Sequence, residues 1–319
     1  MINMNLNQLV YLKELVYTGS FTRAAESCGI SQPALSTQIA LLEEEMELAL
    51  VDRSKKPVRL TREGEAIYEI ASEILQRMDA LKEIPFRLTD RIEGTLMLGI
   101  IPTLAPYFVS MIMGEIHRSY PGLELVVEEL ITEEIILRIR TGHLDAGIIS
   151  TPVEVRGRLL FQPLFYEKFY LYVPDRHPLF RKSKISMEEI DQDEIWYLQE
   201  GNCFRNQVNA LCQLAGRRAG KQKLVYYSNS IESLRRIVES RHGLTFIPEL
   251  ATIQLPAEQE EMIKPIAGRE PVREISLVSA SFLSKKHLLD AFIRTALSQL
   301  PAHMKRKPNG DVVDTALKI

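Results

Sequence analysis

From Gly94 onward the sequence alternates between short runs rich in β-branched and aromatic residues and segments of helical periodicity. This alternation constrains the fold more than any other feature, because it is typical of an α/β region with a largely parallel sheet. About two hundred residues of this kind are enough for two small subdomains. The predicted strands are Thr95–Ile101, Leu123–Glu129, Ala146–Ile149, Phe169–Val173, Ile195–Leu198, Leu224–Tyr227, Leu244–Ile247 and Ile275–Val278, and the predicted helices include Thr132–Arg140, Ser230–Arg241 and Ser284–Leu300.

The sequence before Arg62 has a different pattern, which predicts short helices and tight turns. Ser20 can cap a helix that Gly29 ends, and Ser31 can cap the next one. Two short helices joined in this way outline a helix-turn-helix. The basic run Asp52–Arg62 that follows suits a short hairpin, or wing.

In a helix-turn-helix the second helix lies in the major groove of DNA, with its first residues at the base edges. Gln side chains pair with adenine, and Ser and Thr hydroxyl groups can bond to several base edges. Cations of the wing would contact phosphates, which supplies affinity without sequence specificity. A three-helix interaction domain with a hydrated polar face fits the same pattern. The candidate DNA-contacting residues are Ser31, Gln32, Pro33, Ser36, Thr37, Gln38, Arg53, Lys55 and Lys56.

A long helix is predicted over residues 63–90. Its apolar residues alternate spacings of three and four, and such a narrow stripe over several turns is the pattern of a two-helix seam. The stripe therefore predicts pairing with a second copy of the chain. Its members are Ile67, Ile70, Ile74, Met78 and Leu81.

Length and composition set further limits. A chain of 319 residues suggests two or three domains, and a formal net charge of −3 means that any nucleic-acid binding must come from a local patch. We expect no signal peptide, membrane span, metal ion or cofactor. Only three cysteines argue against a secreted disulfide framework and favour a reducing cytoplasm. The polar residues 304–319 are expected to form a flexible tail.

Cys203 and Cys212 lie nine positions apart on a segment that has the pattern of an amphipathic helix. Nine helical residues advance about 13.5 Å and rotate roughly 180°, which separates the Cα atoms far beyond the ~7 Å limit for a disulfide. Either both cysteines are small buried hydrophobic residues, which is the usual fate of free Cys, or they can bond only when the helix melts.

Phe21–Glu26, Ser31–Ser36 and Leu60–Gly64 resemble the DNA-binding domain of LysR-type transcriptional regulators, and the resemblance extends over nearly the whole chain. It implies a multidomain α+β protein. A winged helix-turn-helix at 1–62 is followed by a linker and dimerisation helix at 63–90 and a regulatory domain at 94–303. The regulatory domain would resemble a periplasmic binding protein, with subdomain I at about 94–166 and 270–303 and subdomain II at about 167–269.

Gly99–Thr103, Pro163–Phe165 and Gly201–Cys203 with Cys212 look like the peroxide-sensing branch of this family. The resemblance implies that Cys203 is the peroxidatic residue, that Cys212 resolves it as a disulfide, and that hydrogen peroxide is the signal. It also implies promoter DNA, RNA polymerase and further copies of the chain, as a dimer and then a tetramer, as partners. Two positions depart from the enteric pattern: Asn202 stands in place of a His, and Asn206 in place of an Asp.

Only a thiolate attacks peroxide efficiently, so we expect the helix start and the nearby Arg205 to lower the pKa of Cys203. Attack gives a sulfenic acid that can condense with a second thiol. Cys212, on the apolar face, should stay protonated until the helix opens.

Further residues resemble pocket positions of the family. Thr103 follows a strand end and can either orient peroxide or cap the next helix. Thr132 can equally be an N-cap, and Arg273 can reach the pocket or form a surface ion pair. The expected peroxide pocket comprises Thr103, Thr132, Asn202, Arg205, Asn206 and Arg273.

The leading hypothesis is a peroxide-responsive regulator that is not an enzyme. The alternative is a regulator of the same family whose cleft binds a small metabolite without redox sensing. A thiol peroxidase would also need a reactive cysteine, but it would leave the helix-turn-helix without a purpose.

Overall fold

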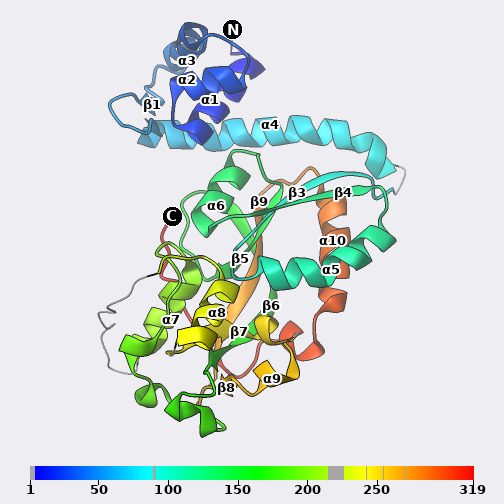
Figure 1. Ribbon diagram of the computed structural model, residues 1–319. Coiled ribbons are helices and arrows are strands. Elements are labelled where there is room, and N and C mark those ends of the chain that lie inside the picture. The colour runs from blue at the N-terminus through cyan, green and yellow to red at the C-terminus, as the bar shows by residue number, and fades with distance from the viewer. Residues whose placement is uncertain (1–3, 89–90, 215–225, 242, 254, 269) are drawn as a thin grey trace.

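The computed structural model describes residues 4–88, 91–214, 226–241, 243–253, 255–268 and 270–319. A small helical domain and a larger α/β domain lie on opposite sides of one long helix, α4 (Arg62–Leu88) (Figure 1). Among these residues no helix is long and apolar enough to cross a membrane.

The small domain is the predicted winged helix-turn-helix. It consists of α1 (Leu6–Thr18), α2 (Phe21–Ser27), α3 (Gln32–Met46) and a hairpin of β1 (Val51–Asp52) and β2 (Arg59–Leu60). Both predicted caps are confirmed, because the Ser20 and Ser31 side chains accept hydrogen bonds from the first turns of α2 and α3. Buried leucine and isoleucine side chains from all three helices form its core.

Helix α4 contacts both domains. Tyr68 is buried in the helix-turn-helix core, and its hydroxyl group donates to the carbonyl oxygen of Arg140 at the end of α6 (Thr132–Arg140), at 3.1 Å. A second contact joins α1 to the loop after α6. The Tyr17 ring stacks on His143 with centroids 3.8 Å apart, and His143 Nε2 lies 3.3 Å from a carboxylate oxygen of Glu14. The two domains of one chain are therefore packed together.

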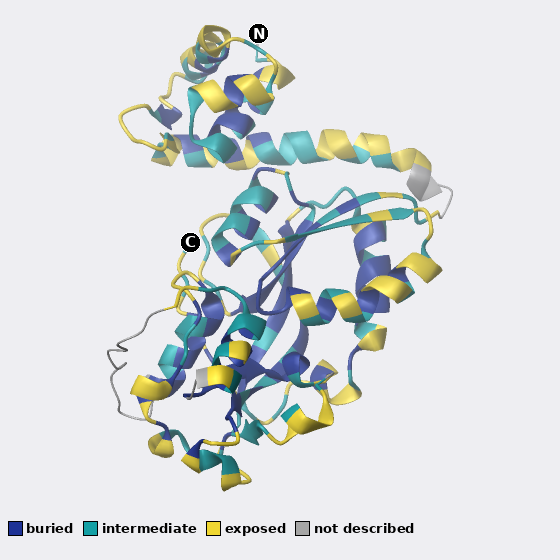
Figure 2. Ribbon diagram, in the orientation of Figure 1, coloured by how far each residue is buried: buried dark blue, intermediate teal, exposed yellow. Residues whose placement is uncertain are grey.

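The predicted apolar stripe of α4 divides between two environments. Ile67 and Ile74 pack against the helix-turn-helix core, whereas Ile70, Met78 and Leu81 are 58%, 36% and 65% exposed. From residue 72 to residue 85 every side chain is exposed or half-buried (Figure 2). Part of the stripe is thus used within the chain, and the exposed part is what a second copy could cover.

The α/β domain is built on one eight-stranded sheet, with the order β4-β3-β5-β9-β6-β7, β10 beside β9 and β8 beside β6. Strand β3 is parallel to β4 and β5, but β9 is antiparallel to β5 and β6. The expectation of a largely parallel sheet is wrong, because β9 returns antiparallel into the centre of the sheet. The strands are β3 (Gly94–Ile100), β4 (Leu123–Glu129), β5 (Ala146–Thr151), β6 (Leu159–Tyr172), β7 (Thr245–Pro248), β8 (Ile263–Pro265), β9 (Pro271–Ala280) and β10 (Asp311–Val312).

Strand β6 runs through two separate hydrophobic cores, and β9 contributes to the first of them. One core lies around β3, β5, α5 and α10, and the other around the end of β6, β7, α7 and α8. Strand β6 is much longer than the predicted strand Phe169–Val173, and its register with β9 shifts between Pro163 and Phe165. Because proline has no N–H group to donate to a neighbouring strand, Pro163 interrupts the strand pattern in the sequence of β6. The helices are α5 (Ala105–Ser119), α7 (Cys203–Leu214), α8 (Ile231–Arg241), α9 (Ala257–Glu260) and α10 (Lys286–Gln299), with 3-10 turns at Pro178–Arg181, Met187–Glu189, Gln192–Glu194, Glu249–Thr252 and Ala302–Lys305.

The predicted strand Ile195–Leu198 is wrong. Ile195 makes only an isolated bridge to Leu244. Residues 224–225 lie outside the described residues, and Tyr226 and Tyr227 are exposed and not in a strand.

The flexible tail expected at 304–319 is also wrong. After a polar run, β10 pairs parallel with β9, and Val313 and Thr315 are buried. The physical reason is a period-two pattern, in which Val313, Thr315, Leu317 and Ile319 turn inward while their neighbours face solvent.

Candidate functional site

Cys203 begins helix α7 at the boundary between the two hydrophobic cores. The Oδ1 atom of Asn202 accepts a hydrogen bond from the backbone N–H of Phe204 at 3.0 Å, so Asn202 caps the helix. Cys203 packs with the core of β3 and β5, whereas Phe204 packs with the core of β7 and α8. The first turn of α7 therefore connects the two cores.

The Cys203 thiol contacts a threonine and lies close to a buried ion pair. Its Sγ atom is 3.2 Å from the Thr132 Oγ1 atom in the first turn of α6. Arg273 on β9 is 0% exposed. Its Nε donates to the carboxylate of Glu167 at 2.7 Å, and its Nη1 donates to the Thr103 Oγ1 atom at 2.9 Å. Arg273 thus forms a buried ion pair, not the surface pair considered from the sequence.

Neither Thr103 nor Thr132 caps the helix that follows it. Helix α5 begins at Ala105 without a side-chain cap, and α6 begins at Thr132, also without one. The hydroxyl group of Thr103 instead accepts from Arg273, and that of Thr132 faces the Cys203 sulfur. Both hydroxyl groups therefore contact the buried side chains at the start of α7 and the middle of the sheet, Thr132 with Cys203 and Thr103 with Arg273.

Burial raises the pKa of the Cys203 thiol, because a thiolate here would lose its water. The hydrogen bond with Thr132 and the positive charge of Arg273 both act to lower this pKa, but burial is the larger effect. The expected lowered pKa is therefore wrong for this conformation. A third group, the backbone N–H of Cys203 at the start of α7, also favours the thiolate.

Two expected pocket residues point elsewhere. The Arg205 guanidinium donates to the carbonyl oxygen of Leu198 at 3.1 Å and to the Glu200 carboxylate at 3.3 Å. The Asn206 Nδ2 atom donates to the carbonyl oxygen of Thr315 at 3.0 Å. The Arg205 guanidinium is therefore engaged by Leu198 and Glu200 and not by the Cys203 thiol.

Cys212 lies further along α7 and belongs to the other core, with Val208 and Leu211. The Tyr197 hydroxyl group is 3.8 Å from its Sγ atom, and burial raises the pKa of its thiol. Both cysteines are free thiols in this structure. Because nine helical residues separate their Cα atoms by about 13.5 Å, a bond between them requires α7 to unwind.

At the other end of the molecule, α3 presents the polar residues predicted to read DNA. Ser31, Gln32, Pro33 and Thr37 are exposed, and Ser36 and Gln38 are half-buried. The Thr37 hydroxyl group donates to the carbonyl oxygen of Pro33 at 2.9 Å, so it is engaged within the helix.

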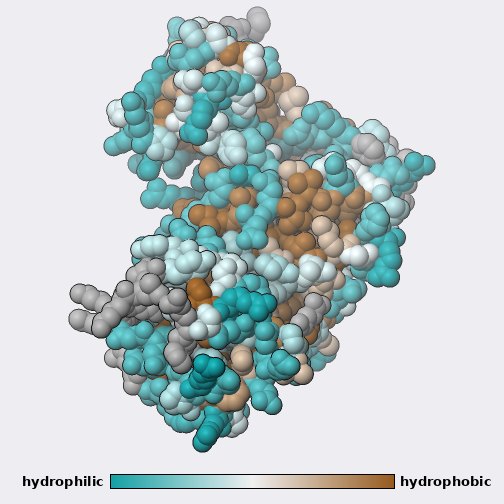
Figure 3. All heavy atoms as spheres, viewed as in Figure 1, coloured by the Kyte–Doolittle hydropathy of each residue, from teal (hydrophilic) through white to brown (hydrophobic). Residues whose placement is uncertain are grey.

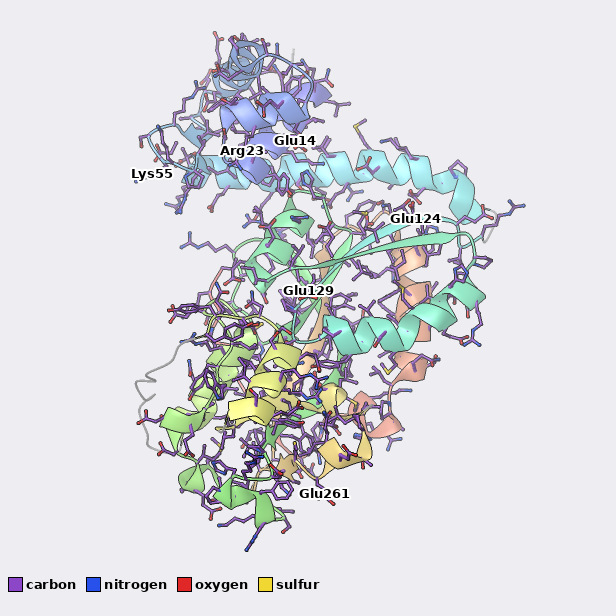
Figure 4. All side chains as sticks on the ribbon, in the orientation of Figure 1. Glu14, Arg23, Lys55, Glu124, Glu129 and Glu261 are labelled. Atoms are coloured by element: carbon purple, nitrogen blue, oxygen red, sulfur yellow. The ribbon has the colours of Figure 1, made fainter. Side chains whose placement is uncertain are left out.

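The wing carries its cations in two different ways. Arg53 forms an ion pair with Glu43 at 3.0 Å and lies over the Phe21 ring. Lys55 and Lys56 are exposed, and Lys55 projects from the outer end of the wing (Figure 4). The two lysines are therefore better placed than Arg53 to contact phosphates.

The structure also contains cavities away from the cysteines. One of about 240 Å³ lies between α4 and the α/β domain and is lined in part by Tyr68, Arg140 and Phe282. Another of about 180 Å³ lies beside α5 and α8 and is lined in part by Tyr107 and Arg235. Neither is lined by Cys203.

A helix-turn-helix joined by one long helix to an α/β domain of two cores defines a class of DNA-binding transcription regulators. Two family models match the chain: the bacterial regulatory helix-turn-helix protein of the lysR family over residues 6–65, and the LysR substrate binding domain over residues 89–301. The chain belongs to the LysR family, and the fold class expected from the resemblance is confirmed.

Several relatives of known name are similar to this chain over most of its length. The "Hydrogen peroxide-inducible genes activator" of Haemophilus influenzae is 34% identical over 275 residues, covering 86% of this chain and 90% of the relative. The "HTH-type transcriptional regulator EstR" of Acinetobacter baylyi is 31% identical over 277 residues, covering 86% and 90%. The structure of a full-length OxyR variant from Pseudomonas aeruginosa superposes with a TM-score of 0.74 at 29% identity, covering 96% of this chain and 99% of that one.

Proposed function

We propose that this chain is a regulator that senses hydrogen peroxide through Cys203 and Cys212 and converts their oxidation into a change of DNA binding. The observation that carries the proposal is the position of the two thiols, which lie in different cores on one helix that must unwind to join them. Relatives named "Hydrogen peroxide-inducible genes activator" from Haemophilus influenzae and Escherichia coli O6:H1, the second at 31% identity over 278 residues, support it.

In the first step the Cys203 sulfur, as a thiolate, attacks one oxygen of hydrogen peroxide. The O–O bond breaks, the leaving hydroxide takes up the proton released by the thiol, and water forms. The sulfur becomes a sulfenic acid, so Cys203 is oxidised by two electrons and peroxide is reduced. Thr132 and Arg273 are placed to stabilise the thiolate.

In the second step the Cys212 sulfur attacks the sulfur of the sulfenic acid. The S–O bond breaks, and the hydroxide leaves with the Cys212 proton as water. Closing a loop of about ten residues has a small entropic cost. Releasing Phe204, Val208 and Leu211 from their core costs roughly 1.5–3 kcal/mol each, so oxidised α7 must pack differently. A change of contacts between subunits is the proposed readout.

Replacing Thr132 by Val should slow the first step. The variant keeps the shape of the side chain but removes the hydroxyl group that lies 3.2 Å from the Cys203 sulfur. A hydrogen bond to a charged group contributes about 1.5–3 kcal/mol, so the rate of sulfenic acid formation should fall by about tenfold or more. Quenched reactions with a sulfenic-acid trap measure this rate, and an unchanged rate would contradict the role given to Thr132.

We propose that α3 reads base edges and that the wing lysines hold the phosphates. Replacing Lys55 and Lys56 together by Ala should weaken binding to specific and random DNA alike. The slope of log affinity against log salt should decrease by about 2, since each phosphate contact contributes roughly one. Gln32→Ala should instead weaken binding to the specific site only. Fluorescence anisotropy at several salt concentrations measures the affinity of each variant for specific and random DNA. If the lysine variant lost affinity for the specific site only, the separate roles given to α3 and the wing would be refuted.

We propose that copies of the chain pair through the exposed part of the α4 stripe, Ile70, Met78 and Leu81. A second apolar surface lies over β4 and α5, where Met113 is 44% exposed (Figure 3). Two separate surfaces of this kind would allow a tetramer. Contact with RNA polymerase stays a prediction. Light scattering measures the mass of the particle in solution. A mass equal to that of one chain would contradict the proposed pairing.

The cavity of about 180 Å³ lined in part by Tyr107 and Arg235 supports a metabolite-binding regulator as the second candidate. Cross-linking of the protein to chromosomal DNA before and after peroxide separates the two. A changed set of bound fragments supports peroxide sensing. An unchanged set, together with a thermal shift on adding a metabolite and none on adding peroxide, supports the alternative.

A further inference from the structure

We propose that the C-terminal segment Asp311–Ile319 is a strap that holds the sensor helix α7 in its reduced position and limits the rate at which the disulfide closes. The inference rests on the proposed function for its effect on signalling. The strap itself is defined by contacts that concern the reduced protein alone.

The strap contacts α7 through two side-chain amides in the segment between the cysteines. The Asn206 Nδ2 atom donates to the carbonyl oxygen of Thr315 at 3.0 Å. The Gln207 Nε2 atom donates to the carbonyl oxygen of Val313 at 2.8 Å, and Gln207 is 0% exposed. Both bonds are made to backbone atoms, so they depend on the path of the strap and not on its side chains.

The strap is itself anchored outside α7. Its first residues pair with β9, where Val312 lies opposite Val272, and the N–H group of Val313 donates to the Val272 carbonyl oxygen at 2.9 Å. Its last residues are fixed to the loop after β5, where the N–H group of Ile319 donates to the carbonyl oxygen of Glu154 at 2.8 Å. The C-terminus accordingly lies beside α7 (Figure 1). The strap therefore ties the middle of the helix to the central sheet at two points.

This placement separates the two chemical steps. Oxidation of Cys203 occurs at the first residue of α7 and breaks no bond to the strap. Disulfide closure must unwind the residues from Cys203 to Cys212, which include both amide donors. The strap should therefore slow closure while leaving sulfenic acid formation unchanged.

Three variants of the full chain test this. Asn206→Asp replaces the amide donor with a carboxylate of the same shape, which repels the Thr315 carbonyl oxygen. A chain ending at Asp314 lacks the Thr315 acceptor and the distal anchor. Lys318→Ala is the control, because this strap residue pairs only with the exposed Glu154 carboxylate.

Disulfide closure is followed by quenched mass spectrometry, and sulfenic acid formation by trapping in a Cys212→Ser background. We expect closure to accelerate about fivefold for Asn206→Asp, which loses one hydrogen bond, and about 25-fold for the truncated chain, which loses the bond to Thr315 and the distal anchor, at about 1 kcal/mol each. The sulfenic acid rate of the truncated chain should stay within about twofold. Unchanged closure, or an equal change in both steps, would overturn the strap.

Hydrogen exchange of the α7 amides in the reduced protein tests the strap without any oxidation. Exchange should be faster in Asn206→Asp and in the truncated chain than in Lys318→Ala. Faster exchange in a protein whose Cys203 does not react with peroxide would keep the strap and refute the proposed sensing function. Equal exchange in all three variants would refute the strap whatever the redox result.

Discussion

Cys203→Ser should give a folded protein that still binds DNA but no longer responds to hydrogen peroxide. A serine hydroxyl group can keep the contact with Thr132 that the Cys203 sulfur makes at 3.2 Å, so the packing of α7 should change little. The hydroxyl group does not become a nucleophile toward peroxide, because the reaction needs a thiolate. The peroxide-dependent change in promoter occupancy should therefore vanish entirely.

The matched control is Cys28→Ser. Cys28 is half-buried at the end of α2, far along the chain from the sensor helix, and this variant should respond to peroxide like the unchanged protein. Footprinting over a range of peroxide concentrations compares the two. A Cys203→Ser protein that shifts at the same peroxide concentration as the control would exclude Cys203 as the sensor.

Arg273→Met should destabilise the regulatory domain severely. Arg273 and Glu167 are both 0% exposed and form an ion pair of 2.6 Å. Removing the guanidinium leaves the Glu167 carboxylate buried without a countercharge, with only the Leu250 N–H group still donating to it, and breaking a buried ion pair in this way costs about 3–5 kcal/mol. Replacing Glu167 by Leu in the same chain removes that carboxylate, so the double variant should recover most of the lost stability. Urea unfolding of the full chain measures each free energy.

The double variant also isolates the effect of the charge on the thiol. It lacks the cation that lowers the pKa of Cys203, so its sulfenic acid formation should be slower than in the unchanged protein although its fold is restored. Equal loss of stability in the single and double variants would contradict the ion-pair argument. An unchanged oxidation rate would contradict the electrostatic role of Arg273.

Local patterns predicted local structure well. The caps at Ser20 and Ser31, the wing, and the strand Leu123–Glu129 depend on neighbouring residues, and all are present. The order and direction of the strands depend on pairings between distant segments, which no local pattern contains. The C-terminal strand was missed although its alternation is visible, because the polar residues before it indicated a disordered tail.

The site was predicted in part for the same reason. Thr132 and Arg273 were selected by resemblance. In the structure the Thr132 hydroxyl group contacts the Cys203 sulfur, and the charge of Arg273 acts on the same thiol. Glu167 and Gln207 were missed, since their partners lie 106 residues away in the chain in both cases. Arg205 was expected to activate Cys203 because it is near in sequence, but a residue two positions along a helix points in a different direction.

The proposed sensing mechanism depends on one covalent event, the linkage of Cys203 to Cys212 through the unwinding of α7. A peptide map of the full chain before and after mild peroxide measures that event directly. The expected result is that the two free thiols of the reduced protein are replaced by one peptide pair joined through Cys203 and Cys212, at the peroxide concentration that changes promoter occupancy. Occupancy that changes while both cysteines remain unlinked would contradict the account.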